Sequence, residues 1–212
     1  MSKSKIKIIV FDMDGVLVDI ESSWQYVHNA FNVDNQDNLR RYLEGEITYS
    51  EFMKRDILLW GPLHINKIKQ VLDKVPIMKG AKLTISKLKK HGYKTCIISG
   101  GISILAQRIQ KELGIDHSFA NKLVVDEKGM LTGHGEEIVN LLNKLLILRK
   151  FASEQRITLR SCAIVGDSIF DIQLFAEAGL SIAFNASDER VKQAADVTVD
   201  NKDLTRILPY FV

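Results

Sequence analysis

Residues 7–19 read KIIVFDMDGVLVD, in which an apolar, β-branched run stops at two aspartates one residue apart. The run over residues 6–11 predicts a strand buried in a parallel sheet, because such strands are apolar on both faces. Side chains alternate along a strand, so Asp12 and Asp14 would point to the same side while Met13 points away. Carboxylates are costly to bury, and ligands of α/β proteins bind at the carboxyl ends of the strands. The pattern therefore favours a Mg²⁺ site and a carboxylate nucleophile over its alternative, a polar Asp-x-Asp-Gly turn.

Two later strands are also predicted to end in residues that suit phosphate chemistry. Residues 93–98 form an apolar run that leads into Ser99-Gly100-Gly101, where a hydroxyl and bare backbone N–H groups before a helix would cradle a phosphate. Residues 161–165 lead into Gly166-Asp167, and Asp171 follows four residues later, on the helix face that turns back to this loop. Each motif alone also fits an ordinary strand-to-helix turn. Three such strand ends in one chain favour a single shared site.

In these three motifs the chain resembles the haloacid dehalogenase-like phosphohydrolases, and among them the phosphoserine phosphatases. The resemblance implies that Asp12 attacks phosphorus and forms an aspartyl-phosphate. It implies that Asp14 protonates the leaving oxygen and then activates water, and that Ser99 and the Gly100 amide hold the phosphoryl group. It also implies a Mg²⁺ cofactor, with the ligands Asp12, the main-chain carbonyl of Asp14 and Asp167, and with Asp171 as a further ligand or a supporting partner.

The family also carries a lysine that offsets the negative charge of this site, and its position is the least certain of the motifs. Lys144 takes this role if a helix starts there, after Asn143. Lys150 is the other candidate, and a helix that starts at Glu136 would instead leave Lys144 on the surface. We favour Lys144 as the catalytic and phosphate-binding lysine.

The resemblance extends to substrate recognition. Glu21 stands nine residues after Asp12, where phosphoserine phosphatases bind the substrate amino group, and Arg55 matches the context of their carboxylate-binding arginine. The alternatives are a helix cap for Glu21 and a solvated helix face for Arg55. Asn185 follows a predicted strand at the same edge, either as a supporting residue or as a turn residue. Phe170 stands where many relatives have asparagine.

The best single substrate is therefore O-phosphoserine. Another small phosphorylated metabolite (a sugar phosphate, a nucleotide or pyridoxal phosphate) is the alternative. A phosphotransferase that uses the same intermediate, or a catalytically silent binding module, is also possible on this fold. The cap aromatics Trp24, Tyr26, Phe52 and Trp60 are expected to pack between helices rather than to contact a ligand.

Short β-branched runs alternate with amphipathic helices, which predicts an α/β fold with a doubly wound, Rossmann-like parallel sheet. The predicted strands are residues 6–11, 93–98, 118–125, 161–165, 180–184 and 196–199. The predicted helices are residues 81–90, 103–113, 144–155, 170–177 and 188–194. About eighty residues separate the first two strands, and residues 21–74 are helix-like, with a Gly61-Pro62 break. We expect a small helical cap over residues 20–75, inserted into a core formed by residues 1–19 and 76–212.

Composition restricts the partners. The 212 residues carry a net charge of +3 with scattered lysines, so we expect a small phosphorylated metabolite as partner and no nucleic acid or membrane. The two cysteines, Cys96 and Cys162, fall in predicted core strands, as in a protein of a reducing compartment. No apolar leader precedes the first strand, which favours a cytoplasmic location. The sequence leaves both a monomer and a homodimer open.

Overall fold

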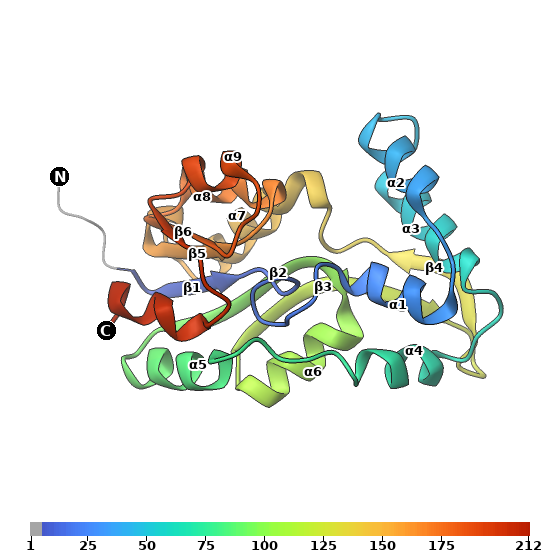
Figure 1. The fold of residues 1–212 in the computed structure, drawn as a ribbon, viewed down its shortest axis with the longest axis horizontal. Coiled ribbons are helices and arrows are strands. Elements are labelled where there is room, and N and C mark those ends of the chain that lie inside the picture. The colour runs from blue at the N-terminus through green and yellow to red at the C-terminus, as the bar shows by residue number, and fades with distance from the viewer. Residues whose placement is uncertain (1–5) are drawn as a thin grey trace.

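The computed structural model describes residues 6–212, which form a seven-stranded sheet with helices on both faces (Figure 1). The strand order is β4-β3-β2-β1-β5-β6-β7, and β4 alone runs antiparallel to its neighbour. The α/β, doubly wound fold predicted from the sequence is confirmed. The strands are β1 (Ile8–Phe11), β2 (Lys94–Ile102), β3 (His117–Val125), β4 (Leu131–Glu136), β5 (Cys162–Gly166), β6 (Leu180–Phe184) and β7 (Val197–Val199).

Strand β1 lies at the centre of the sheet, and its register brings the predicted motifs together. Phe11 pairs with Ile97 of β2 on one side and with Val165 of β5 on the other. The chain leaves the sheet soon after Phe11 and Val165, whereas β2 continues through Ser99–Gly101 to Ile102, four residues beyond the predicted strand end, with a register shift after Ile98. This register is why the polar residues that follow β1 and β5 share one edge with those in the last part of β2.

Both faces of β1 are buried, as its apolar sequence predicts. Ile8 and Val10 belong to a core cluster with Leu148 and Phe151 of helix α7 (Lys144–Glu154). The other face contributes Ile9 and Phe11 to a second cluster, which contains residues of α5 (Ala81–Lys90) and α6 (Ser103–Leu113). Helices α8 (Ile172–Glu177) and α9 (Glu189–Ala194) lie on the α7 side of the sheet (Figure 1).

Four helices fill the long segment between β1 and α5, where the sequence predicts a helical cap. They are α1 (Ser23–Phe31), α2 (Gln36–Leu43), α3 (Tyr49–Leu59) and α4 (Ile65–Leu72). The chain enters and leaves this segment side by side, because the Asp19 N–H donates to the Pro76 carbonyl at 3.0 Å. Val27 of α1 and Ile68 of α4 join the same core cluster as Leu105 of α6. That residues 20–75 behave as a separate domain stays a prediction.

Strand β4 was not predicted, and the reason is its composition. It contains Gly133 and Gly135, which weaken the strand pattern. Gly133 has a φ of 79°, and a Cβ atom there would lie 2.7 Å from a methyl group of Leu58 in α3. The glycine thus lets the cap helix α3 pack closely on strand β4 of the β3–β4 hairpin (Figure 1).

Most other boundaries agree with the sequence to within a few residues. Helix α8 starts at Ile172 rather than at residue 170, because a 3₁₀ turn (Ile169–Asp171) precedes it. A C-terminal 3₁₀ helix, Leu204–Tyr210, packs against α5. Cys96 and Cys162 are free and buried in the sheet. Among residues 6–212 no helix has the length and apolar character needed to span a membrane.

Candidate active site

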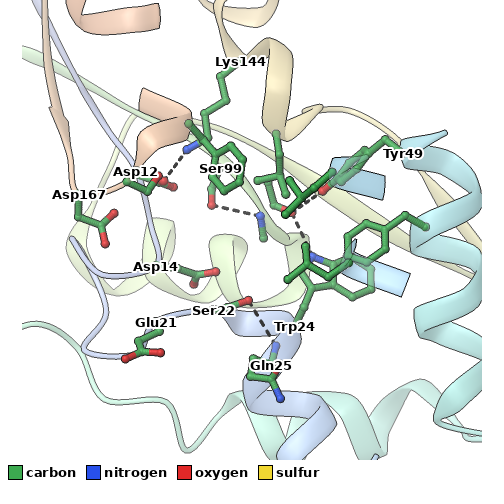
Figure 2. Close-up of a pocket in the computed structure, with 18 of the residues that line it drawn as sticks. Asp12, Asp14, Glu21, Ser22, Trp24, Gln25, Tyr49, Ser99, Lys144 and Asp167 are labelled. Carbon is green, nitrogen blue, oxygen red and sulfur yellow. Dashed lines mark hydrogen bonds and ion pairs between the residues drawn. The ribbon is translucent and has the colours of Figure 1, made fainter. Parts of the chain in front are cut away.

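A cavity of about 360 Å³ lies at the carboxyl ends of β1, β2 and β5, below the cap helices α1–α3. Figure 2 shows acidic side chains on the core side of this cavity and Trp24 and Tyr49 on the cap side. The lining combines polar and apolar groups: Asp12, Asp14, Glu21, Ser22, Trp24, Gln25, Asn35, Leu39, Leu43, Tyr49, Phe52, Ser99, Gly100, Gly101, Leu141, Lys144, Asp167, Ser168 and Phe170.

Lys144 is buried between two carboxylates. The side chain, only 1 % exposed, starts the helix α7 and its Nζ contacts Asp12 Oδ2 and, at 2.8 Å, Asp171 Oδ1. Asp171 is held in turn by the N–H and hydroxyl of Ser168, at 3.2 and 3.0 Å. Lys150, the other candidate lysine, is exposed and lies outside the cavity. The structure thus brings Lys144 to Asp12, as the favoured helix register predicts.

Burial and ion pairing shift the pKa of Lys144 in opposite directions. Burial lowers the pKa of Lys144, but Asp12 and Asp171 outweigh it and the pKa is raised, so the ammonium stays charged. For Asp12, burial is the largest effect and raises the pKa, and Lys144 opposes it. A second hydrogen bond, from the Met13 N–H at 2.6 Å, fixes the carboxylate at the strand end. Asp12 is therefore a poorly hydrated carboxylate with one fixed orientation, which suits a nucleophile.

Asp14 has a different environment, although it lies only two residues away. One carboxylate oxygen, Oδ2, accepts hydrogen bonds from the N–H and the hydroxyl of Ser23, both at 2.8 Å. The other oxygen, Oδ1, is buried and has no partner among the described residues. Burial raises the pKa of Asp14 to about 7, despite the Ser23 hydrogen bonds. A carboxyl group that titrates near neutral pH can donate and accept a proton within one catalytic cycle.

Asp167 completes an acidic cluster. One carboxylate oxygen each from Asp12, Asp167 and Asp171 lie within 4.8 Å of one another. Asp171 accepts hydrogen bonds from Lys144 and Ser168, whereas the Asp167 carboxylate has no hydrogen-bond partner within residues 6–212. Burial, followed by the charges of Asp12 and Asp171, raises the pKa of Asp167 to about 8.

This donor set fits a hard divalent cation, because all its atoms are carboxylate oxygens that repel one another without a counter-charge. Gly15 supports the same arrangement: its φ is 76°, and a Cβ atom there would lie 2.0 Å from Asp167 Oδ2. Asp12 and Asp167 are the available ligands. The Asp14 side chain binds Ser23 instead, so a contribution from Asp14 would come from its main-chain carbonyl, the ligand that the family resemblance implies.

Residues 99–101, in the last part of β2, are predicted as a turn before a helix but belong to the strand, where hydrogen bonds from three elements fix them. Ser99 is buried, and its hydroxyl accepts from the Gly101 N–H at 3.2 Å. The Gly100 carbonyl accepts from Trp24 Nε1 at 3.1 Å, from the Tyr49 hydroxyl at 3.1 Å and from Asn121 Nδ2 at 2.9 Å. Two of these donors come from the cap, as the dashed lines in Figure 2 show. The cap therefore holds the orientation of the peptide that faces the predicted phosphate position.

Asn121 in β3 connects residues 99–101 to the rest of the core. Its Oδ1 accepts from the N–H groups of Ile138 and Val139, both at 2.8 Å, and its Nδ2 also donates to Val139 O and to the Tyr49 hydroxyl. The side chain is fully buried. A satisfied buried amide of this kind fixes the packing of the loops around it.

The remaining predicted site residues lie in different places. Glu21 lines the cavity at its edge, below Asp14 in Figure 2. Arg55 is not brought to the cavity: it lies on α3, its side chain is 32 % exposed, and its Nε donates to Glu51 Oε1 at 2.9 Å. Asn185 has a φ of 49° and lines a separate depression, which reaches Asp167 from the other side.

Two of the cap aromatics both pack in the cap and line the cavity. Trp24 and Phe52 are these two residues, and Phe52 stacks on Tyr42; that they make no contact with a ligand stays a prediction. Trp24 also stacks on Trp60, with ring centroids 5.5 Å apart. Phe170, which replaces a polar residue of many relatives, adds to the apolar lining.

Sequence reasoning missed Ser23, Tyr49 and Asn121, which orient the predicted residues. Asn121 could have been recognised from the sequence, because it is a polar residue within a predicted strand, next to buried Ala120. No sequence pattern points to Ser23 or Tyr49, since each acts across the contact between cap and core. Their partners are set by how α1 and α3 pack, which no local pattern reveals.

Comparisons with known proteins agree with this geometry. The family model of haloacid dehalogenase-like hydrolases matches residues 6–179. The chain is similar to phosphoserine phosphatase of Methanocaldococcus jannaschii, with 34 % identity over 212 residues that cover 99 % of each protein. It is also similar to phosphoserine phosphatase of Lactococcus lactis, with 31 % identity over 96 % of this chain and 94 % of that protein.

Solved structures give the same result. The fold matches a phospho-aspartyl intermediate analogue of phosphoserine phosphatase with a TM-score of 0.83, at 33 % identity over 98 % of this chain and 100 % of the other. A substrate-bound phosphoserine phosphatase complex matches with a TM-score of 0.83, at 33 % identity over 98 % of this chain and 99 % of the other. The motifs, the fold and these similarities agree: the chain belongs to the haloacid dehalogenase-like hydrolase family.

Proposed function

We propose that this protein hydrolyses small phosphomonoesters through a phosphorylated Asp12, and that O-phosphoserine is a substrate. The observation that carries the proposal is the contrast between the two neighbouring carboxylates. Asp12 is fixed beside Lys144, whereas Asp14 has one buried oxygen free to exchange a proton. The relatives named phosphoserine phosphatase support the choice of substrate.

In the first step Asp12 Oδ attacks phosphorus while the bond from phosphorus to the ester oxygen breaks. Protonated Asp14 gives its proton to the leaving oxygen, so the alcohol departs neutral. Ser99, the Gly100 N–H and Lys144 stabilise the negative charge on the transferring group. Closure of the cap over the bound ester would exclude water from the cavity until the phosphoenzyme has formed.

In the second step water attacks the aspartyl-phosphate, and ionised Asp14 takes up the proton of this water. The products are inorganic phosphate and Asp12 in its starting state, with Asp14 protonated again. One residue thus serves as acid and then as base, which requires a pKa close to the working pH. The value of about 7 meets this requirement.

Mg²⁺ is the metal that we propose for the carboxylate cluster, with Asp12 and Asp167 as side-chain ligands. When bound, it neutralises charge on the phosphoryl oxygens and offsets the repulsion between the two carboxylates. Asp171 supports the site through Lys144. A cytoplasmic location and the choice between monomer and homodimer stay predictions from the sequence.

The test is phosphate release, with and without Mg²⁺, from O-phosphoserine, O-phosphothreonine, sugar phosphates, nucleotides and pyridoxal phosphate. Asp12→Asn serves as the inactive control, since it keeps the shape of the side chain and removes the nucleophile. Turnover of O-phosphoserine that needs both Mg²⁺ and Asp12 supports the proposal. Turnover of other esters alone would retain the mechanism and reject the substrate, and absence of turnover with every ester would reject the mechanism.

A further inference from the structure

Tyr49 lines the cavity from the cap, but its hydroxyl is bound to the core. The residue begins helix α3 and is buried, and its hydroxyl donates to the Gly100 carbonyl at 3.1 Å. Asn121 Nδ2, which can only donate, lies 3.0 Å from the same hydroxyl oxygen, so the hydroxyl hydrogen is directed to Gly100. Burial raises the pKa of Tyr49, and the group therefore keeps this hydrogen and stays a donor.

The Gly100 carbonyl belongs to the peptide unit that joins Gly100 to Gly101. The N–H of the same unit donates to the Ser99 hydroxyl oxygen at 3.2 Å. A trans peptide unit is planar, so its carbonyl and its N–H point in opposite directions and turn together. Dashed lines in Figure 2 mark the contacts that Tyr49 and Ser99 make with this unit. A donor that holds the carbonyl on the cap side therefore also holds the N–H on the Ser99 side.

The Ser99 hydroxyl is the group that this peptide unit orients. Ser99 lines the cavity and is buried, and its hydroxyl oxygen accepts from the Gly101 N–H. The hydrogen of the same hydroxyl has no acceptor among residues 6–212, so it is available to a phosphoryl oxygen in the cavity. A donor that is oriented in advance needs no reorganisation when negative charge develops on the transferring group.

The cap thus acts on the phosphate end of the cavity through a peptide unit of the core. Tyr49 and Trp24 donate to the Gly100 carbonyl from the cap. Asn121 is the third donor and belongs to the core, so only its hydrogen bond would hold the unit after departure of the cap. Coupling between two sites is reciprocal, and a phosphate bound to Ser99 should in turn favour the cap position described here.

We propose that Tyr49 is a positioning residue for phosphate binding, which holds the Gly100–Gly101 peptide unit from the cap and thereby directs the Ser99 hydroxyl to the phosphoryl group. The proposal rests on the proposed phosphatase function and adds to it a residue outside the catalytic motifs of the core. The alternative is that the Tyr49 ring only forms part of the wall beside the leaving group. The two roles affect different ligands, because every phosphomonoester has the phosphoryl group whereas leaving groups differ.

Tyr49→Phe removes the hydroxyl and keeps the ring, and Tyr42→Phe is its matched control. Tyr42 is buried in the same aromatic cluster, and its hydroxyl also crosses to the core, where it donates to Asn140 Oδ1 at 3.0 Å. We expect Tyr49→Phe to lower kcat/KM about fivefold for O-phosphoserine and equally for ethyl phosphate, the effect of one neutral hydrogen bond. Tyr42→Phe should lower both values by less than about twofold.

A double-mutant cycle with Ser99→Ala tests whether Tyr49 acts through Ser99. In the Ser99→Ala background the peptide unit has no hydroxyl to orient, so Tyr49→Phe should lower kcat/KM by less than about twofold. The dissociation constant of inorganic phosphate, measured by calorimetry with Mg²⁺ present, should follow the same pattern. Tyr49→Phe should raise it about fivefold when Ser99 is present and by less than about twofold when Ser99 is replaced.

Two results would overturn the proposal. An equal loss from Tyr49→Phe with and without the Ser99 hydroxyl would show that Tyr49 acts independently of Ser99. A loss with O-phosphoserine and none with ethyl phosphate or inorganic phosphate would show that Tyr49 acts on the leaving group.

The unchanged protein separates the failure of this inference from the failure of the proposed function. If it hydrolyses either ester in a reaction that needs Mg²⁺ and Asp12, and Tyr49→Phe behaves like Tyr42→Phe, the positioning role is wrong and the phosphatase mechanism stands. If the unchanged protein hydrolyses no phosphomonoester, the proposed function itself is rejected and the inference falls with it.

Discussion

Ser23 donates two hydrogen bonds of 2.8 Å to the same carboxylate oxygen of Asp14, one from its backbone N–H and one from its hydroxyl. The hydroxyl oxygen also accepts from the Ile102 N–H at 3.1 Å, at the end of β2, so its hydrogen is directed to Asp14. Only Asp14 Oδ1 is left for a proton. Ser23 is the first residue of the cap helix α1, and the position of the cap thereby sets the orientation of the candidate acid and base.

Replacement of Ser23 tests this relationship. Ser23→Ala removes the hydroxyl that donates to ionised Asp14, so the pKa of Asp14 should rise. At neutral pH kcat should therefore fall by about tenfold, and KM should change less than kcat. Steady-state kinetics from pH 5 to 9 measure both changes. Thr48→Ala, which removes the cap residue of α3 at the surface, is the control for helix stability and should leave the pH profile in place. An unchanged profile in Ser23→Ala would separate Ser23 from the proton transfer.

The pH dependence of the two steps should have opposite signs. Formation of the aspartyl-phosphate needs protonated Asp14, so its rate should decrease above a pH of about 7, the raised pKa of this group. Hydrolysis of the aspartyl-phosphate needs ionised Asp14, so its rate should decrease below that pH. Rapid-quench measurement of phosphoenzyme separates the steps. Two rates with the same pH dependence would contradict the assignment of both roles to Asp14.

Removal of Lys144 should destabilise the protein as well as inactivate it. Lys144→Met leaves the buried carboxylates of Asp12 and Asp171 without their common partner, which should lower the free energy of unfolding by about 3–5 kcal/mol. Urea denaturation checks the value. Lys150→Met, at an exposed position of the same helix, should lower it by less than about 0.5 kcal/mol. The double variant Lys144→Met/Asp171→Asn should recover part of the loss, because one unpaired charge is gone.

Asp167 should link metal binding to stability. The native pKa of about 8 lies above the ordinary value of 3.8, so the metal-free native state holds its proton more tightly than the unfolded state does. Stability should therefore fall as the pH rises between these values. At pH 8.5, Asp167→Asn should raise the Tm of the metal-free protein and abolish the increase in Tm that Mg²⁺ gives the unchanged protein. A full response of Asp167→Asn to Mg²⁺ would remove Asp167 from the ligand set.

Arg55 should contribute little to substrate binding in the structure described. Its partner is Glu51, one helical turn away, in a half-exposed ion pair. Arg55→Gln should keep the KM for O-phosphoserine within about twofold and the free energy of unfolding within about 0.5 kcal/mol. A large increase in this KM, without a change for O-phosphoethanolamine, which has the amino group and no carboxylate, would show that Arg55 turns into the cavity and binds the carboxylate.

The sequence predicts the core side of this site well, because the relevant residues follow directly from strand ends. Asp12, Ser99 and Asp167 each come after an apolar run, and the parallel register of β1 with β2 and β5 then forces them together. A lysine was expected from the family resemblance, and the predicted helix start favoured Lys144 over Lys150. These positions depend on local pattern and on one rule of sheet geometry, both of which are visible in a single chain.

The cap side was predicted less well, since its contacts depend on how helices pack. Glu21 lines the cavity and Arg55 does not, although both were chosen from the resemblance to phosphoserine phosphatases. Strand β4 was missed because its glycines, which weaken the strand pattern, are needed for the close approach of α3. Asn35, which lines the cavity, was not identified from the sequence, since its orientation depends on a hydrogen bond to Asp56, 21 residues later in the chain.

The stacked pair of Trp24 and Trp60 gives this protein an optical reporter of its own. They are the two tryptophans of the chain, and the Trp24 indole N–H donates to the Gly100 carbonyl in the last part of β2. Departure of α1 from the sheet would break that hydrogen bond and wet the indole, shifting its emission to longer wavelength. Filling of the cavity by orthovanadate or another phosphate mimic would hold the indole in place and oppose the shift. Opening and closing of the cap can thus be followed by intrinsic tryptophan fluorescence in the unlabelled protein.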